Sequence, residues 1–367
     1  MKRVVYLAQA FPVVTETFTA KEVIALRSQG LDVTVRSMRP APPGPPELDE
    51  LRPLVRVINP RRGLVGALRE ARHATTPRRL LAAARGVALA RELDPRRYHL
   101  HAQFPLEAAS AGLFAATTAG FSFSFSIHTL HRPDLIEDKL RAAMFVICGS
   151  EYEREEVGSR YGPEARAKVE VRRLGVPPRA AREGFERGLV VSVGTLIGKK
   201  GHDVLIRAVA ALGRPVRLVI VGEGPERSRL EALARELGVA LELPGATSHD
   251  RALELMGQAQ AFALCCRETT AGDHDFLPVA LMDAMSLGTP CVSSRFVGIP
   301  ELIEDGEQGL LGPPGDPQAA AERIAAILDD DALGARLGTA GREKVRADFD
   351  LERNSARLAE LFSERLA

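Results

Sequence analysis

The chain has 367 residues, a length that corresponds to two domains as a prior and leaves each of them enough residues for a hydrophobic core. Hydrophobic residues make up 45% of the chain and charged residues 26%, as in ordinary soluble globular proteins, and the formal net charge of +1 demands no polyanionic partner. Aromatic residues are only 5% and tryptophan is absent, which argues against the stacking surfaces that hold single-stranded nucleic acid, so no nucleic-acid partner is predicted.

Strand-like and helix-like segments alternate through the first half of the chain. An apolar strand over residues 4–8 is followed by a helix over 17–28 and a second strand over 31–36. Further strands are expected at 98–103, 122–127 and 144–148. This alternation is typical of a parallel sheet with helices on both faces.

The same alternation restarts near residue 189, after a proline-containing linker at 175–178. Strands are predicted at 189–193, 216–221, 261–265 and 290–293, and helices at 202–212, 226–237, 279–287, 318–328, 331–348 and 351–366. We therefore predict an α/β protein with two doubly wound, Rossmann-like domains, residues 1–178 and 179–348, and a terminal segment 349–367.

A basic stretch interrupts the first domain. Residues 51–99 hold twelve arginines and only three acids, and helical pieces at 64–74 and 78–93 each have an apolar face and an arginine-rich face. This pattern is typical of a solvated helix surface, and the alternative is a docking surface for anionic lipid or another polyanion. Both interpretations stay open at this point.

The four cysteines form no CxxC pair, and no histidine stands at zinc-ligand spacing. We predict buried free thiols, no metal site and, as the default for such thiols, a reducing cytoplasm. The apolar start resembles a signal peptide only superficially, because polar residues follow at once. No apolar run reaches the ~18 residues of a membrane span, so we expect a cytoplasmic protein that is at most peripheral to a membrane.

Two strand-to-helix turns in the second half are candidates for phosphate binding. The first runs from Gly194 to Gly201 at the carboxyl end of a strand, where open α/β sheets bind ligands. Its Lys200 lies beside a helix N-terminus, which favours an anion such as a diphosphate. The second turn starts at Gly222 and also permits close approach of a ligand to the backbone, although it is not a GxGxxG motif. Each turn is also compatible with simple turn chemistry.

A polar loop at 273–278 and the helix after it carry two carboxylates. Asp275 lies just before the expected helix start near Pro278, and Asp283 lies one to two turns inside the helix. One carboxylate at the helix mouth and one along its body can bind two hydroxyl-bearing parts of a single ligand. The alternative is a helix cap and an ordinary surface acid.

His128 follows a strand in the first half, at that strand's carboxyl end. A lone histidine is usually structural, but this position favours a functional role.

Several segments, in this order, resemble retaining glycosyltransferases of family 4 with the GT-B fold, and the resemblance covers nearly the whole chain. Thr15-Glu16-Thr17-Phe18 followed by Glu22 is similar to the Ser-Glu-Thr-Phe start of the branch found in exopolysaccharide and colanic-acid-type pathways. Three further matches are His101-Ala102-Gln103-Phe104 to His-Ala-His-Phe, Ser150-Glu151-Tyr152-Glu153-Arg154 to Ser-Glu-Tyr-Asn-Arg, and Gly298-Ile299-Pro300-Glu301-Leu302 to Gly-Ile-Pro-Glu-Leu.

The resemblance implies a GT-B fold whose last helix crosses back onto the N-terminal domain, and a UDP- or GDP-sugar donor. By resemblance, Lys200 binds the donor diphosphate, Asp283 the ribose and Asp275 the donor sugar, while His128 lies near the reactive face of that sugar. By the same resemblance, the amides of Phe276, Leu277 and Pro278 hold the diphosphate as well. The other donor-binding positions are Gly194, Thr195 and Gly222, and the acceptor and interdomain positions are Thr15, Glu16 and Thr17. No metal is expected if Lys200 and backbone amides carry the charge of the diphosphate, and no cofactor is expected.

This sequence departs from the family pattern at three places. The family's Glu-x7-Glu is Asp275-x7-Asp283 here, Thr195 stands where a basic residue is frequent, and His131 stands where an acid is frequent. Transfer of a sugar from a nucleoside diphosphate to a hydroxyl, in a cleft between the domains, is the predicted function. The alternatives are a non-catalytic or weakly active sugar-nucleotide-binding protein and a sugar-nucleotide epimerase of the same fold. A nicotinamide dehydrogenase is disfavoured, because no GxGxxG follows the first strand.

Overall fold

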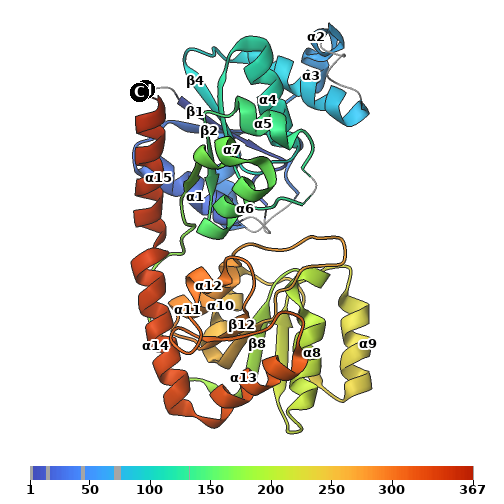
Figure 1. Cartoon of the computed structure of the whole chain (residues 1–367), viewed down its shortest axis with the longest axis vertical. Coiled ribbons are helices and arrows are strands. Elements are labelled where there is room, and N and C mark those ends of the chain that lie inside the picture. The colour runs from blue at the N-terminus through green and yellow to red at the C-terminus, as the bar shows by residue number, and fades with distance from the viewer. Residues whose placement is uncertain (1–2, 14–16, 43–45, 70–75, 132, 367) are drawn as a thin grey trace. The chain divides into compact units, whose positions relative to one another are not determined.

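The computed structural model describes residues 3–13, 17–42, 46–69, 76–131 and 133–366, and the chain divides into two compact units. Unit 1 comprises Met1–Arg173 with Glu352–Ala367, and unit 2 comprises Leu174–Leu351 (Figure 1). The first boundary lies before the linker prolines, because Val176 is buried in the unit 2 core. Phe349 is buried there as well, so the segment that returns to unit 1 begins at Glu352 rather than at residue 349.

Unit 1 is built on a seven-stranded sheet in which every neighbouring pair of strands is parallel. Its strands are β1 (Arg3–Ala8), β2 (Val33–Ser37), β3 (Val55–Val57), β4 (Tyr98–Ala102), β5 (Ser122–Ser126), β6 (Phe145–Cys148) and β7 (Val169–Val171). The spatial order is β3-β2-β1-β4-β5-β6-β7, so the direction of winding reverses between β1 and β4.

Helices cover both faces of this sheet. The helices of unit 1 are α1 (Thr17–Ser28), α2 (Leu64–Arg69), α3 (Pro77–Glu92), α4 (Glu107–Ala119), α5 (Ile136–Ala142), α6 (Glu151–Tyr161), α7 (Pro163–Ala167) and α15 (Leu351–Leu366). On one face, α1 and α15 share a core with β1 in which Val23, Tyr6 and Phe362 are buried. On the other face, α4 packs so closely that a Cβ on Gly112 would lie 2.6 Å from the Phe123 ring. The last helix therefore packs on the N-terminal sheet, as the resemblance implied.

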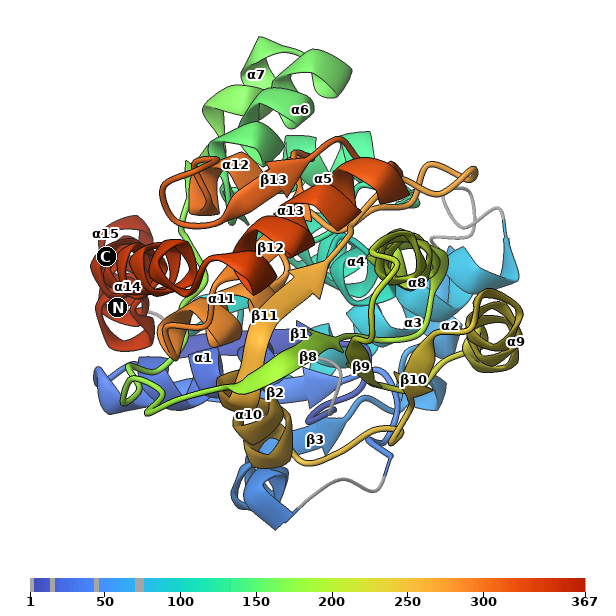
Figure 2. The ribbon, with the colours of Figure 1, turned by 90° about the horizontal axis from the view of Figure 1, so that it is seen from below.

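Unit 2 is built on a six-stranded sheet that is also parallel throughout. Its strands are β8 (Glu186–Val193), β9 (Arg217–Val221), β10 (Ala240–Glu242), β11 (Ala259–Leu264), β12 (Cys291–Ser294) and β13 (Leu310–Gly312). The spatial order is β10-β9-β8-β11-β12-β13, and Figure 2 shows β8 and β11 as neighbours at the centre, where the winding reverses.

Two hydrophobic cores sandwich the unit 2 sheet. The helices are α8 (His202–Ala211), α9 (Arg227–Leu237), α10 (His249–Gln258), α11 (Val279–Ser286), α12 (Ile299–Leu302), α13 (Pro317–Asp329) and α14 (Asp331–Asp348). One core is formed with α8, α9 and α13, and the other with α10, α11 and α14 (Figure 2). All four cysteines, Cys148, Cys265, Cys266 and Cys291, are buried free thiols, as predicted. Within the ranges given above, no helix combines the length and the apolarity needed to cross a membrane.

Candidate functional site

The loops that follow β8 and β11 form the candidate site in unit 2. These strands are neighbours in the sheet although β9 and β10 lie between them in the sequence. Open α/β sheets bind ligands outside the carboxyl ends of the strands at such a reversal. The loop after β8 contains a short 3-10 turn, Gly198–Lys200, and the loop after β11 leads to the start of α11.

Two lysines of the first loop contact two aspartates of the second. Lys200 Nζ lies 2.5 Å from Asp275 Oδ2, and Lys199 Nζ lies 3.1 Å from Asp275 Oδ1 and 3.3 Å from Asp273 Oδ1. Burial alone would raise the pKa of Asp275, but Lys200 and Lys199 outweigh it, and the pKa is lowered from its ordinary value. Burial would likewise lower the pKa of Lys200, but the negative charge of Asp275 raises it. Both partners are therefore ionised near neutral pH, and the structure brings together the predicted residues Lys200 and Asp275.

Three glycines allow the loops of this site to pack against each other. Gly201 has φ +66°, and a Cβ there would lie 1.8 Å from the carbonyl oxygen of Cys265 in the loop after β11. Gly222 has φ +151°, and its Cβ would lie 2.0 Å from the Gly194 carbonyl oxygen. A Cβ on Gly194 would meet the Lys200 side chain at 3.3 Å. The turns at Gly194 and Gly222 are thus adjacent, and Gly194 leaves room for the Lys200 side chain. The Thr195 side chain beside them is exposed.

The start of α11 corrects one expectation. The helix begins at Val279, and Pro278 is the N-cap residue, with no side chain capping the helix. Proline has no amide hydrogen, so the expected phosphate contact from a Pro278 amide is wrong. The Leu281 amide donates to the Pro278 carbonyl at 3.1 Å, which leaves the amides of Val279 and Ala280 as first-turn donors at this helix start. Among the other two predicted positions of this segment, Phe276 is buried and Leu277 packs against the unit 2 core.

Asp283 is buried in α11 and belongs to a different group of side chains from Asp275. Its Oδ1 atom lies 3.6 Å from Arg179 Nη2 and 3.8 Å from His249 Nε2, and it has no hydrogen-bond partner among the described residues. Arg179 Nη2 lies 3.1 Å from His249 Nε2. The sequence interpretation missed both residues. Ser248, which precedes His249, is the N-cap of α10 and accepts a hydrogen bond from the Arg251 amide. Serine is a preferred N-cap residue, so the sequence could have placed His249 at a helix start.

Arg267 is a third residue that the sequence interpretation missed. It follows β11, and its Nη2 donates to both carboxylate oxygens of Asp203, at 3.0 and 2.9 Å. Its amide donates to the Lys199 carbonyl at 3.0 Å, and its Nε donates to the Gly198 carbonyl at 3.3 Å. Arg267 therefore fastens the loop after β11 to the turn that carries Lys199 and Lys200.

His128 lies in unit 1, just beyond the carboxyl end of β5. Its ring packs edge-on against Phe18 and Phe104, with ring centroids 5.0 Å apart in both cases. Burial lowers the pKa of His128 to about 4, so the ring is neutral near pH 7. Nε2 is buried and finds no hydrogen-bond partner within the described ranges. Of the predicted acceptor and interdomain positions, Thr15 and Glu16 lie outside the described residues, and Thr17 is the first residue of α1.

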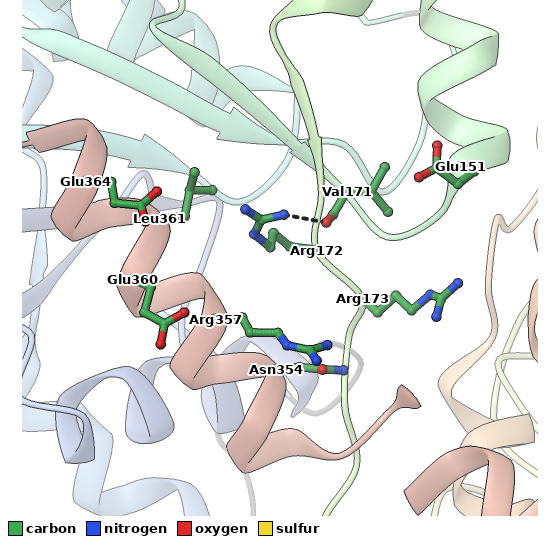
Figure 3. A pocket seen from close by; sticks show the side chains of 9 residues that line it. All are labelled: Glu151, Val171, Arg172, Arg173, Asn354, Arg357, Glu360, Leu361 and Glu364. Carbon is green, nitrogen blue, oxygen red and sulfur yellow. Dashed lines mark hydrogen bonds between the residues drawn. The ribbon is translucent and has the colours of Figure 1, made fainter. Parts of the chain in front are cut away.

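A cavity of about 430 Å³ in unit 1 contains none of the predicted site residues (Figure 3). It lies between α15 and the segment that follows β7, and its charged lining residues are Arg172, Arg173, Arg357, Glu151, Glu360 and Glu364. Arginines and glutamates balance in this lining, so its charge favours neither an anionic nor a cationic ligand.

Comparison with known proteins places the chain in a family. Residues 180–344 match the model of the glycosyl transferases group 1 family. Over 277 residues the chain is 33% identical to the GDP-mannose-dependent alpha-(1-6)-phosphatidylinositol monomannoside mannosyltransferase of Mycolicibacterium smegmatis, and the match covers 70% of this chain and 72% of that protein. The chain belongs to the group 1 glycosyltransferases. This confirms the family resemblance predicted from the motifs.

A further relative is named for the biosynthesis of an exopolysaccharide, colanic acid. A Salmonella typhimurium protein named for colanic acid biosynthesis, WcaL, is 38% identical over 179 residues, covering 47% of this chain and 44% of the relative. The Escherichia coli protein of the same name is matched over 51% of its length. The chain thus spans about half the length of these curated relatives.

Solved structures agree with the fold over the whole chain. Anabaena Alr3699/HepE in complex with UDP and glucose has a TM-score of 0.79 at 19% identity, covering 99% of this chain and 100% of that one. Sucrose-phosphate synthase from Thermosynechococcus elongatus has a TM-score of 0.76 at 20% identity, covering 99% of both chains. At this identity the likeness shows the fold alone, and it confirms the predicted GT-B class with two Rossmann-like domains.

Proposed function

We propose that the protein transfers a sugar from a nucleoside diphosphate to a hydroxyl of a saccharide-containing acceptor, and that unit 2 binds the donor. The observation that carries this proposal is the pairing of Lys200 with Asp275 at the reversal of the unit 2 sheet. Family membership and the names of the relatives support it: one is GDP-mannose-dependent, and a protein of the same fold was solved with UDP and glucose.

The charges of the site suit a diphosphate. Without ligand, Asp275 neutralises Lys200, and Lys199 is shared between two carboxylates. An incoming diphosphate would compete for both ammonium groups and would also meet the amides at the start of α11. Asp275, displaced from Lys200, would then accept hydrogen bonds from hydroxyls of the donor sugar. Because lysines and backbone amides supply the positive charge, we propose that neither a metal nor a cofactor is used.

The buried Oδ1 of Asp283 supports the proposed ribose contact. It is an acceptor that finds no donor among the described residues, and a ribose hydroxyl supplies one. Arg179 and His249 would hold the carboxylate in place from the side.

In the reaction that we propose, the bond from the sugar's anomeric carbon to the diphosphate oxygen breaks and a bond to the acceptor oxygen forms. The acceptor's proton passes to an oxygen of the departing diphosphate. Lys200 and the α11 amides stabilise the negative charge that grows on that diphosphate. This electrostatic stabilisation of the transition state is the main contribution to the rate that we propose for these residues. Retention of configuration is proposed from the family. His128, neutral near pH 7, would act as a hydrogen-bonding partner of the transferred sugar rather than as a cation.

UDP or GDP is expected to raise the melting temperature without added metal. At a concentration one hundred times its dissociation constant, a ligand that binds only the folded protein adds about 2.7 kcal/mol to the free energy of unfolding. Thermal denaturation with UDP, GDP or neither, each in chelator and in magnesium, measures this. Stabilisation that disappears in chelator and returns with magnesium would show that the metal-free proposal is wrong.

Two alternatives to transfer are separated by following a labelled sugar nucleotide. Many transferases hydrolyse the donor slowly when no acceptor is present, whereas a non-catalytic binding protein leaves it intact. An epimerase instead returns a sugar nucleotide of changed configuration, which chromatography of the products detects. Binding of UDP without any turnover would favour the non-catalytic protein.

We further propose that the basic stretch contacts an anionic membrane surface. Val57, Leu64 and Val65 are exposed in this stretch, Val65 to 65%, and the exposed Arg56 and Arg61 lie close to them in sequence. Exposed aliphatic groups beside arginines match the chemistry of an anionic leaflet, because the hydrocarbon enters the interface while the guanidinium groups meet lipid phosphates.

Sedimentation with vesicles tests this membrane proposal. Binding to vesicles with anionic lipid should exceed binding to neutral vesicles and should fall steeply with salt, since each basic side chain near the surface contributes about 1 kcal/mol and is screened within a Debye length. The double variant Arg56→Glu/Arg61→Glu should lose binding, and Arg235→Glu on α9 of unit 2 is the control. Equal binding to neutral and anionic vesicles, or none to either, would support the solvated helix surface.

A further inference from the structure

One buried lysine of unit 1 binds three backbone carbonyls. Lys139 lies on α5 and has no exposed surface. Its Nζ atom donates hydrogen bonds to the carbonyl oxygens of Pro105 at 2.7 Å, Leu106 at 3.1 Å and Asp134 at 2.6 Å. An ammonium group has three N–H donors, and burial makes each unpaired donor costly. The three carbonyls therefore match the donors of a charged Lys139 one for one.

These carbonyls belong to two segments that meet at His128. The first two come directly after Phe104 in the chain, and the Phe104 ring packs edge-on against the His128 ring with centroids 5.0 Å apart. The third belongs to Asp134, in the loop that leads from His128 at the end of β5 to α5. Lys139 thus fastens the segment against which the histidine ring packs to the loop that carries the histidine.

The turn beside the third carbonyl is strained. Leu135 has φ +55°, in the left-handed region that residues other than glycine rarely adopt. Such strain persists only where the surroundings fix the backbone, and it gathers at functional sites. Here the Lys139 amide donates to the Leu135 carbonyl at 3.0 Å. From α3, Arg79 Nε donates to both carboxylate oxygens of Asp134, at 3.1 and 3.0 Å. Contacts from two helices therefore fix this turn.

The charge of Lys139 decides how many carbonyls it can bind. Burial lowers the pKa of Lys139 to about 7, with the negative charge of Asp134 opposing the change and the positive charges of Arg78 and Arg79 adding to it. Below that pH the side chain is an ammonium group with three donors. An uncharged amine would keep only two donors for three carbonyls. The fastening is therefore complete on the acidic side of neutrality.

We propose that Lys139 is a positioning residue for His128, which it acts on by fixing the segment of Phe104 against the loop that carries the histidine. This role rests on the proposed function, in which a neutral His128 contacts the transferred sugar. It adds a residue that controls the histidine without touching the sugar. Burial lowers the pKa of His128 to about 4, so loosening of its surroundings should admit water and let that pKa return toward its ordinary value.

NMR of the histidine ring tests the proposal without any substrate. The ring C–H resonance that is absent from His128→Gln is followed between about pH 7 and pH 5, where Lys139 is charged. In the unaltered protein it should hardly move, because the ring stays neutral. In Lys139→Met it should titrate, with a pKa raised toward the ordinary value of about 6.5. Lys139→Gln, which keeps some N–H donors, is the second variant should Lys139→Met fail to fold, and its effect should be smaller.

Lys168→Met is the matched control. Lys168 Nζ also donates to three backbone carbonyls, those of Leu140 at 3.0 Å, Arg141 at 2.7 Å and Ala143 at 3.0 Å. These carbonyls lie at the opposite end of α5 from Asp134. Lys168→Met removes the same number of hydrogen bonds from the same helix, so it reports the loss of stability alone. His128 should stay neutral in this variant.

Turnover gives a second readout in the full chain. Hydrolysis of labelled UDP-glucose and GDP-mannose should fall roughly tenfold or more in kcat in Lys139→Met, because a small displacement of a group that contacts the sugar is costly. Stabilisation by UDP should be unchanged, since the proposed nucleotide site lies in unit 2. Lys168→Met should keep both properties.

The outcomes separate this role from the proposed function. A His128 that titrates in Lys139→Met but not in Lys168→Met, with lower turnover and an unchanged response to UDP, supports the proposal. An unchanged His128 in the folded Lys139 variants, an equal change in Lys168→Met, or a changed His128 with normal turnover would each overturn it. If the unaltered protein turns over neither donor and UDP does not stabilise it, the proposed function is contradicted, and the NMR comparison alone decides whether Lys139 positions His128.

Discussion

Replacing Lys200 with alanine is expected to lower kcat/KM for sugar transfer by about 10²–10³-fold, the effect of removing one group that stabilises a developing oxyanion. The variant should bind UDP more weakly and should also turn over more slowly, because the ammonium group meets the diphosphate in the ground state and more strongly as the leaving charge grows. Asp275 would retain only the ion pair with Lys199, at 3.1 Å. Donor affinity and turnover, measured separately, report the two effects.

Lys344→Ala is the control for this prediction. Lys344 is also an ion-paired lysine of unit 2, with its Nζ 2.7 Å from Asp348 Oδ2, but it lies on α14 and not in either loop of the site. Its removal should leave donor affinity and turnover unchanged. A folded Lys200→Ala protein with normal affinity and normal turnover would remove Lys200 from the donor site.

Gly201→Ala is expected to reduce the free energy of unfolding by about 2–5 kcal/mol and to abolish stabilisation by UDP. A non-glycine residue at φ +66° costs roughly 1–2 kcal/mol. The new Cβ would also lie 1.8 Å from the Cys265 carbonyl oxygen, so the loops after β8 and β11 must move apart, and overpacking of this kind typically costs about 1–3 kcal/mol. Since Lys200 precedes Gly201 and Asp275 follows Cys265, that movement separates the ion pair.

Gly213→Ala isolates the backbone part of this effect. Gly213 has φ +62°, nearly that of Gly201, but a Cβ there would meet nothing within 4 Å. Its alanine variant should lose only the backbone cost and should still be stabilised by UDP. Chemical denaturation gives the free energy of unfolding for both variants, and thermal denaturation with UDP gives the response to ligand. Equal effects of the two substitutions would mean that the contact between the loops is not important.

The class of fold and most of its central elements were predictable from the sequence alone. Helix α1 and the central strands β1 and β8 were predicted because each depends on local hydrophobic periodicity and on flanking turn residues, which are written in the chain. The four strands that were missed, β3, β7, β10 and β13, are all three residues long and stand at the edges of the sheets. Such strands are held by pairing with one neighbour, so their own sequence carries little signal.

The candidate site in unit 2 is assembled by contacts between segments that are far apart in the sequence. Local reasoning placed Lys200 in the loop after a strand and Asp275 just before a helix start, but it did not predict that they would form an ion pair. That contact exists because β11 lies next to β8 in the sheet, although β10 is the strand that precedes it in the chain. The spatial order of strands is a property of the whole sheet. The contacts of Asp283 with Arg179 and His249 depend in the same way on distant segments. Only the packed fold brings these segments within a few ångströms, because side-chain contacts act over that range and local sequence does not encode them.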